Sequence, residues 1–248
     1  MSDELSIVVP TRDGAPYAFV IADAYRRAGL SALFVVDGRS SPRYRAEALA
    51  RIPSAVILEV ERSGDFVEAM LPEIARLVAS KWLFRFDDDE FPSAALIDWL
   101  PQGVASVTRK VIAAPRRGVA MIAGVPHFAA TVPGLLAGDD QCRGFVVEAA
   151  RFSPALHSPG LDLKPGDVDD APADCFIYHF DWIVRSRDER ARKLAHYQAI
   201  SGEPLTRFRH QYLYEDFDPA LYDFTPVDDP MIADLTLRLD EARRAHAP

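Results

Sequence analysis

The chain has 248 residues, a formal net charge of −9 and 49% hydrophobic residues. This length and balance fit one folded unit with a full core and exclude a disordered chain. The acidic charge argues against a nucleic-acid partner, because a negative protein repels the phosphate backbone. It suits a protein that holds a divalent cation with carboxylates.

The two cysteines, Cys142 and Cys175, are too few for a disulfide framework and lack the spacing of a zinc site. We therefore expect free thiols in a reducing compartment. Residues 1–5 lack the basic start and apolar stretch of a signal peptide, and no window reaches the roughly 20 apolar residues of a membrane span. The sequence predicts a cytoplasmic protein without a transmembrane segment, and peripheral membrane association stays open.

Strand and helix patterns alternate over the first hundred residues. The strands are expected at 5–9, 31–36, 55–60 and 82–86, and the helices at 16–28, from 42 onward and at 66–80. Ser41 and Pro42 are placed to cap and open the second helix, and Pro72 is placed to bend or restart the third. The alternation predicts a parallel sheet covered by helices on both faces, with ligands at the carboxyl ends of its strands.

The second half is less regular. Strands are expected at 104–114, 118–123, 145–152 and 174–180, with a turn at 115–117, a loop over 126–144 and irregular chain over 153–172. Ser186 and Glu189 have the spacing of a capping box, which predicts a helix from 186 to about 200. A last helix is expected over 231–245.

Four adjacent carboxylates, Asp87, Asp88, Asp89 and Glu90, follow the fourth strand directly. Such a run is costly unless a cation or solvent compensates it, and Mg²⁺ or Mn²⁺ accepts carboxylate oxygens while keeping positions open for phosphate oxygens. Residues spaced by two point the same way in extended chain, so Asp87 and Asp89 can share one ion. A solvated acidic turn is the alternative interpretation.

In its setting, the run F-D-D-D-E-F at 86–91 resembles the DxD region of GT-A glycosyltransferases, especially family-2-like bacterial enzymes. The resemblance implies an α/β fold of the GT-A type, a Rossmann-like and mostly parallel sheet flanked by helices, with an irregular C-terminal half. It implies one domain over 1–248, with a nucleotide-binding half at 1–100 and an acceptor-binding half at 101–248. The motif's carboxylates, here Asp87, Asp88 and Asp89, would bind the donor ribose and the metal that bridges its diphosphate.

The ends of the earlier strands resemble the same family. Residues 6–12 (S-I-V-V-P-T-R) resemble its opening strand and turn, where the nucleotide base and ribose rest, and residues 35–41 resemble its second turn. The residues that the resemblance assigns to the nucleotide are Pro10, Thr11, Arg12, Asp37 and Arg62.

A late segment, 177–197, resembles the family's H-x-x-W run and the basic helix after it. The resemblance implies that His179 completes the metal shell together with Asp87 and Asp89; neutral imidazole is a sound ligand for Mn²⁺. Arg185 and Lys193 are the candidates for contact with the diphosphate, where positive groups stabilise the departing charge.

An inverting enzyme also needs a carboxylate that removes a proton from the acceptor hydroxyl. Family-2-like enzymes take it from an acidic pair between the DxD motif and the late histidine, where this chain has Asp139 and Asp140. We prefer Asp140, with Asp139 and Glu148 as the other candidates; the usual Glu-Asp is Asp-Asp here and comes early, so inversion or retention stays open.

The resemblance implies transfer of a sugar from a nucleotide-sugar donor, UDP-sugar by analogy, to a glycan or small-molecule acceptor in surface polysaccharide or glycoconjugate assembly. A nucleotidyltransferase is the first alternative, although residues 9–14 lack its glycine-rich loop. A calcium-binding module is weakened because Pro92 and Asp98 stand where its loop requires glycine and glutamate. An inactive, partner-binding relative stays open.

Overall fold

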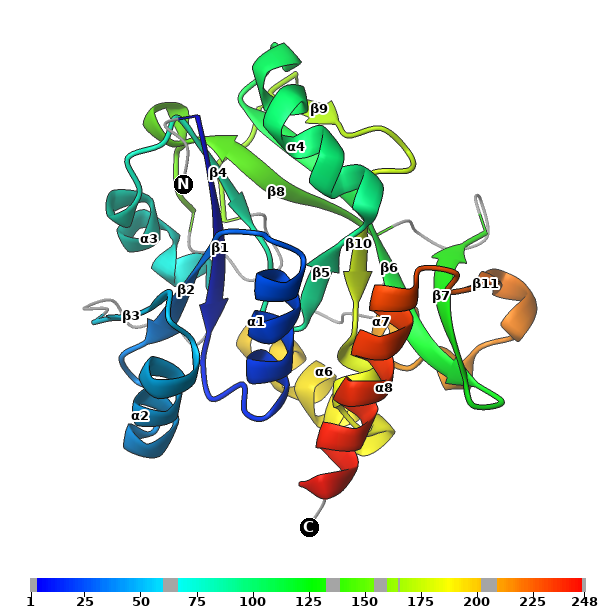
Figure 1. The fold of residues 1–248 in the computed structure, drawn as a ribbon. Helices are drawn as coiled ribbons and strands as arrows, with labels where there is room; N and C mark the ends of the chain where they lie inside the picture. The colour runs from blue at the N-terminus through cyan, green and yellow to red at the C-terminus, as the bar shows by residue number, and fades with distance from the viewer. Residues whose placement is uncertain are drawn as a thin grey trace.

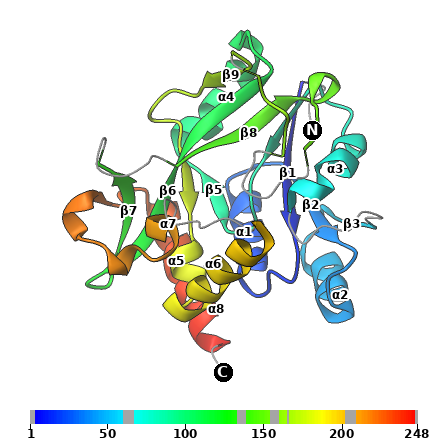
Figure 2. The same ribbon diagram turned by 180° about the vertical axis from the view of Figure 1, so that it is seen from behind.

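The computed structural model describes residues 4–59, 67–132, 139–153, 160–164, 166–201 and 209–246. Its centre is an 11-stranded sheet in which eight strands follow the order β11-β7-β6-β8-β4-β1-β2-β3 (Figure 1). Helices cover the sheet on both sides (Figure 2). The α/β architecture that the sequence predicted is confirmed.

The first half consists of parallel units. Its elements are β1 (Leu5–Thr11), α1 (Tyr17–Arg27), β2 (Ala32–Asp37), α2 (Pro42–Arg51), β3 (Ala55–Leu58), the 3₁₀ helix η1 (Val67–Met70), α3 (Leu71–Leu77) and β4 (Trp82–Arg85). Strands β3, β2, β1 and β4 are parallel neighbours in that order. Ser41 caps α2 by accepting a hydrogen bond from the Tyr44 amide, as its position predicted.

The second half mixes antiparallel and parallel pairs: β6 pairs antiparallel with β7 and β8 but parallel with β9 and β10. This half contains β5 (Glu90–Pro92), α4 (Ala94–Ser106), β6 (Val111–Ile122), β7 (Val125–Thr131), β8 (Asp140–Val146), η2 (Val147–Ala149), β9 (Val168–Asp170) and β10 (Ile177–His179). Then follow α5 (Asp181–Val184), α6 (Arg187–Ser201), α7 (Arg209–Tyr212), η4 (Tyr214–Asp216), η5 (Pro219–Leu221), β11 (Tyr222–Pro226) and α8 (Pro230–Ala245).

The predicted turn at 115–117 is wrong, because β6 runs through it as one strand of 12 residues. The strand changes partners there: Pro115 is the last residue paired with β8, and Gly118 is the first paired with β7. A proline lacks an amide donor and is tolerated where a ladder ends. The predicted strand start at residue 104 is also wrong, because Val104 lies in α4.

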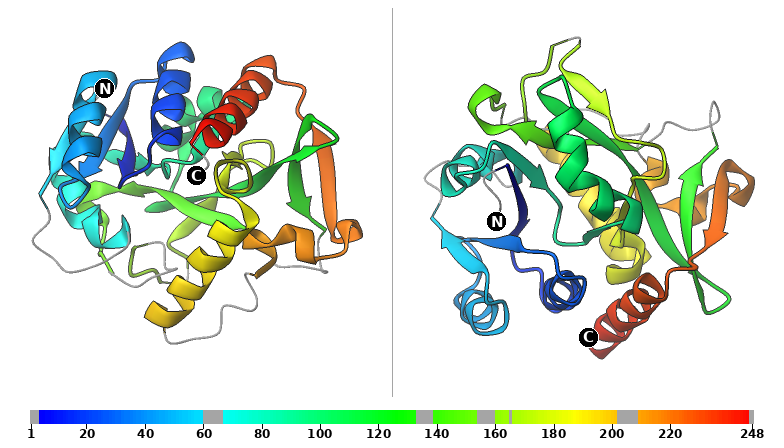
Figure 3. Two further views of the ribbon diagram at one scale, coloured as in Figure 1. Left: turned by 90° about the horizontal axis from the view of Figure 1, so that it is seen from below. Right: turned by 45° about the horizontal axis from the view of Figure 1, so that its top comes forward.

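Two cores flank the sheet, because side chains alternate between its faces. Ile7 and Val9 of β1 pack with α1, α4, α5 and α8, whereas Val8 packs with α3. Figure 3 shows α1, α2 and α8 on one side of the sheet and α6 on the other. In the described residues no helix is both long and apolar enough to cross a membrane.

Candidate active site

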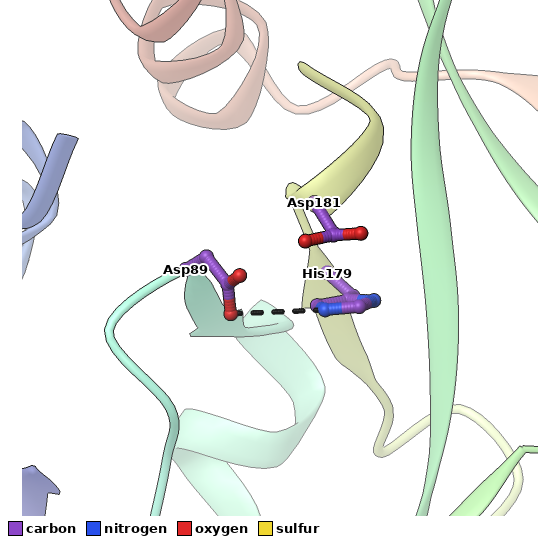
Figure 4. Close-up of side chains that lie close together, drawn as sticks. All are labelled: Asp89, His179 and Asp181. Carbon is purple, nitrogen blue, oxygen red and sulfur yellow. Dashed lines mark ion pairs between the residues drawn. The ribbon is translucent and has the colours of Figure 1, made fainter. Parts of the chain in front are cut away.

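The acidic turn meets the late histidine because β5 pairs antiparallel with β10. In this register Glu90 lies opposite His179, and the Phe180 amide donates to the Asp89 carbonyl at 2.8 Å. Asp181, the first residue of α5, follows two residues after His179. Figure 4 shows Asp89, His179 and Asp181 gathered from these three elements.

These three side chains form the group that can hold a metal. One ligand atom from each lies within 4.8 Å of the others, and all three residues are buried. Asp89 Oδ1 and His179 Nε2 are 3.7 Å apart. The structure therefore brings together Asp89 and His179 of the predicted metal set, with Asp181 in the place expected for Asp87.

The ionisation of the group suits a hard divalent cation. Burial and the nearby Arg116 lower the pKa of His179 to about 4, so its imidazole is neutral at pH 7. Burial opposes ionisation of Asp89 and Asp181, yet His179 and Arg185 lower the pKa of Asp89 to about 2, and Lys193 and Arg185 hold that of Asp181 far below its usual range. Two carboxylates and a neutral imidazole are the ligand types that Mn²⁺ accepts.

One oxygen of Asp181 is left without a partner. Asp181 is 0% exposed, and its Oδ2 atom accepts no hydrogen bond from any described residue. A buried carboxylate oxygen without a donor is costly, and a coordinated cation would remove that cost. The residues present therefore fit a divalent metal.

Asp87 has an arginine as its partner instead of the metal ion that the sequence predicted. Its carboxylate accepts from Arg143 Nη2 at 2.7 Å, and it is 29% exposed. Arg143 also holds Glu90, and Arg116 contacts Glu90 at 3.2 Å and Asp139 at 2.6 Å. A buried chain of alternating charges thus connects Asp87 to Asp139. The sequence gives no local signal for it.

Asp88 joins the acidic turn to the end of β1. Its Oδ2 accepts from Thr11 Oγ1 at 2.5 Å, and Thr11 Oγ1 lies 2.6 Å from the hydroxyl of Tyr44. Burial and the neighbouring Asp89 raise the pKa of Asp88 to about 7. The structure therefore brings Thr11 and Asp88, two of the predicted nucleotide-binding residues, into direct contact.

The other predicted nucleotide-binding residues of the first half lie around the same strand ends. Pro10 is buried and Arg12 is exposed. Asp37 is 1% exposed; burial opposes its ionisation, but hydrogen bonds from Arg39 keep its pKa below the usual value. Arg39 approaches it at 2.7 Å, a contact that the sequence did not suggest. Arg62 lies outside the described residues.

Arg185 and Lys193 both reach the metal-binding group. Arg185 Nη1 donates to Asp89 Oδ2 at 2.6 Å and also to Asp181, and Lys193 Nζ contacts Asp181 Oδ1 at 2.8 Å. Arg185 Nη2 donates to the Tyr17 hydroxyl at 2.8 Å. Both cations therefore lie beside the candidate metal group, and in this structure carboxylates are their partners.

The three candidate bases lie in different surroundings. Asp139 lines a hollow that it shares with Arg116, His179, Trp182 and Tyr222. Asp140 is exposed at the start of β8. Partial desolvation of its carboxyl group and the negative charge of Asp170 raise its pKa. Asp139 thus shares a hollow with His179, whereas Asp140, the candidate preferred from the sequence, does not line it.

Glu148 is not brought to the site, which corrects the sequence prediction for it. It is exposed in η2, just beyond the end of β8, and the neighbouring Val147 amide bonds to Lys81 before β4 begins. Because β8 runs antiparallel to β4, Glu148 lies at the opposite end of β4 from Asp87.

Comparisons with known proteins give a likeness of fold. No protein-family model and no curated protein matches the chain. The structure of a mycobacterial protein aligns with 85% of the chain and 75% of its own length, at 14% identity and a TM-score of 0.53.

Two further structures align with lower scores. Residues 1–349 of S. aureus TarS cover 86% of the chain and 73% of their own length, at 12% identity and a TM-score of 0.47. Glucosyl-3-phosphoglycerate synthase from Mycobacterium tuberculosis, in complex with Mg²⁺ and uridine-diphosphate, covers 91% and 88%, at 14% identity and a TM-score of 0.47. Likeness at such identities describes the fold alone. The chain has an α/β fold with helices on both sides of a central sheet, the architecture that its sequence resemblance implied.

Proposed function

We propose that the chain is a metal-dependent glycosyltransferase that takes a UDP-sugar donor. One observation carries the proposal: two ionised carboxylates and a neutral histidine meet at the carboxyl edge of a parallel sheet, beside the turn that follows β1. Ligands of α/β sheets bind at that edge. The nucleotide class comes from the sequence resemblance.

In this proposal Asp89, His179 and Asp181 hold Mn²⁺ or Mg²⁺. When bound, the cation neutralises charge that develops on the leaving diphosphate. Thr11, Asp37 and Asp88 bind the base and ribose, with Pro10 shaping the turn and Arg12 at its rim. Asp87 orients the ribose from its place on Arg143.

Arg185 and Lys193 act on the departing diphosphate. Both carry partly exposed cationic groups beside the metal ligands, with side chains 21% and 23% exposed. A guanidinium binds phosphate oxygens through two parallel hydrogen bonds, which fixes the leaving group as well as neutralising it.

The acceptor, a glycan or a small molecule, enters from the hollow that Asp139, His179 and Trp182 line. Asp139 is the base that this geometry favours, because it shares that hollow with a metal ligand, whereas Asp140 faces solvent. Surface polysaccharide or glycoconjugate assembly is the setting that the resemblance suggests.

Asp89→Asn tests the proposal. The change keeps the shape of the side chain but removes the charge on the carboxylate that is common to the sequence-predicted and the structural metal sets. We expect Mn²⁺-dependent binding of UDP to fall by more than about tenfold in calorimetry. Asp98→Asn removes the same charge from an exposed position on α4 and should bind as the unaltered protein does.

Two results would remove the assignment. The first is unchanged, metal-dependent UDP affinity in the folded Asp89→Asn protein. The second is an unaltered protein that binds no nucleoside diphosphate with or without Mn²⁺. Hydrolysis of a UDP-sugar in the presence of Mn²⁺ then separates an active enzyme from an inactive, nucleotide-binding relative.

A further inference from the structure

Arg185 occupies both carboxylates of the candidate metal group at once. We propose that Arg185 competes with the divalent cation for Asp89 and Asp181, so that the cation binds well only when a diphosphate draws Arg185 away. The inference rests on the proposed function and adds to it a coupling between its two ligands.

The contacts of Arg185 define the competition. A single nitrogen, Nη1, donates to carboxylate oxygens of both Asp89 and Asp181, and the other terminal nitrogen donates to Tyr17. Its guanidinium also lies over the Tyr17 ring, 5.1 Å from the centroid. A side-chain cation thus already performs the neutralisation that a metal ion would perform.

The charge of the group is balanced without a metal. Asp89 and Asp181 are paired with Arg185 and Lys193, so each carboxylate already has a cationic partner. A divalent ion would add two positive charges in a buried place, where repulsion is strong. Binding of the cation alone is therefore weak.

Arg116, the other cation close to His179, does not take part in this balance. It is held by Glu90 and Asp139. Within the described part of the chain, Arg185 is the cation that ion-pairs with both Asp89 and Asp181.

A diphosphate offers Arg185 a better partner. The side chains of Arg185 and Lys193 are 21% and 23% exposed, whereas those of Asp89, His179 and Asp181 are 9% exposed or less. An anion arriving from solvent therefore meets the two cations first. Once Arg185 turns to the phosphate oxygens, Asp89 loses its arginine partner and Asp181 keeps only Lys193. Both carboxylates then bind the metal better, and the affinity of each ligand rises when the other is bound.

The test measures Mn²⁺ binding by electron paramagnetic resonance of the free ion, first with Mn²⁺ alone and then with UDP. In Arg185→Gln the carboxylates lose their competitor, so we expect Mn²⁺ alone to bind at least about tenfold more tightly than to the unaltered protein. The gain in Mn²⁺ affinity on adding UDP should shrink correspondingly.

Arg192→Gln is the matched control, since Arg192 is exposed on the same helix as Lys193. It should leave both measurements unchanged. Mn²⁺ also binds free UDP in solution. The amount bound in this way is the same in both experiments, so a difference between the variant and the control reports only the coupling between Mn²⁺ and UDP on the protein.

Equal or weaker binding of Mn²⁺ alone to Arg185→Gln overturns the inference and makes Arg185 a residue that orients the ligands. If Arg185→Gln does not fold, Arg185→Lys takes its place: its single ammonium group spans two carboxylates less well, so tighter Mn²⁺ binding supports the competition and unchanged binding contradicts it. An unaltered protein that binds no Mn²⁺ even with UDP instead removes the proposed function itself.

Discussion

At the scale of single residues, Asp181 takes the place in the metal group that spacing in the sequence suggests for Asp87. Asp87 and Asp89 are two apart in extended chain, yet the carboxylate of Asp87 turns to Arg143 and Asp181 arrives from α5 to join Asp89 and His179. The signal for Asp181 was present in the sequence, two residues after the histidine. In the H-x-x-W pattern Asp181 occupies an unspecified position, so the resemblance assigns it no role.

Asp181→Asn should therefore damage metal binding more than Asp87→Asn does. The first removes a ligand charge, and we expect the affinity for Mn²⁺ in the presence of UDP to fall by more than about tenfold. The second leaves Asp89, His179 and Asp181 intact, so it should weaken UDP itself with less effect on Mn²⁺. Titrating each ligand at saturating concentrations of the other distinguishes these effects. The reverse pattern would restore Asp87 as the ligand.

At the scale of elements, the turn after β1 is fitted closely to the acidic turn after β4. Gly14 lies so near that an added Cβ atom would stand 2.4 Å from Asp88 Oδ2 and 2.9 Å from Thr11 Oγ1. The absence of a side chain at this position lets Thr11 donate to Asp88. The two parallel strands thus place their ends at hydrogen-bonding distance.

Gly14→Ala should push the Asp88 carboxylate away from Thr11. A hydrogen bond contributes about 1 kcal/mol net, so we expect UDP affinity to fall by roughly fivefold. Mn²⁺ binding without nucleotide should not change, because Asp89, His179 and Asp181 lie outside the contact. Calorimetry with each ligand separately measures both effects; unaltered UDP affinity would show that this turn does not shape the nucleotide site.

The alternating first half was predictable because each of its elements is local. A helix start such as Ser41-Pro42 is determined by adjacent residues, and the position of Asp89 follows from the strand before it. The second half was harder to predict because its strands choose partners far along the chain. Two features depend on the pairing of β8 with β4 and β6. One is the change of strand partners at Pro115, and the other is the approach of Arg143 to Glu90, which lie 53 residues apart in sequence.

At the scale of the whole molecule, α8 connects the two halves that the sequence suggested. It packs against α1, which follows the nucleotide turn, and against α5, which begins with Asp181. Arg238 pairs with Asp23 at 2.8 Å, and Asp234 pairs with Arg27 at 2.7 Å. Because one helix supports both sides of the site, we predict that residues 1–248 unfold as one cooperative domain.

Leu239→Ala tests that cooperativity. Leu239 is 0% exposed in the larger core, so its truncation should lower the free energy of unfolding by about 2–5 kcal/mol. Leu237, on the same helix, is 45% exposed, and Leu237→Ala should cost no more than about 0.5 kcal/mol. Urea denaturation followed by circular dichroism and by tryptophan fluorescence should give one shared midpoint for each protein. If Leu239→Ala separated the two signals, the halves would be independent units, and α8 would not be what holds the nucleotide turn against the metal ligands.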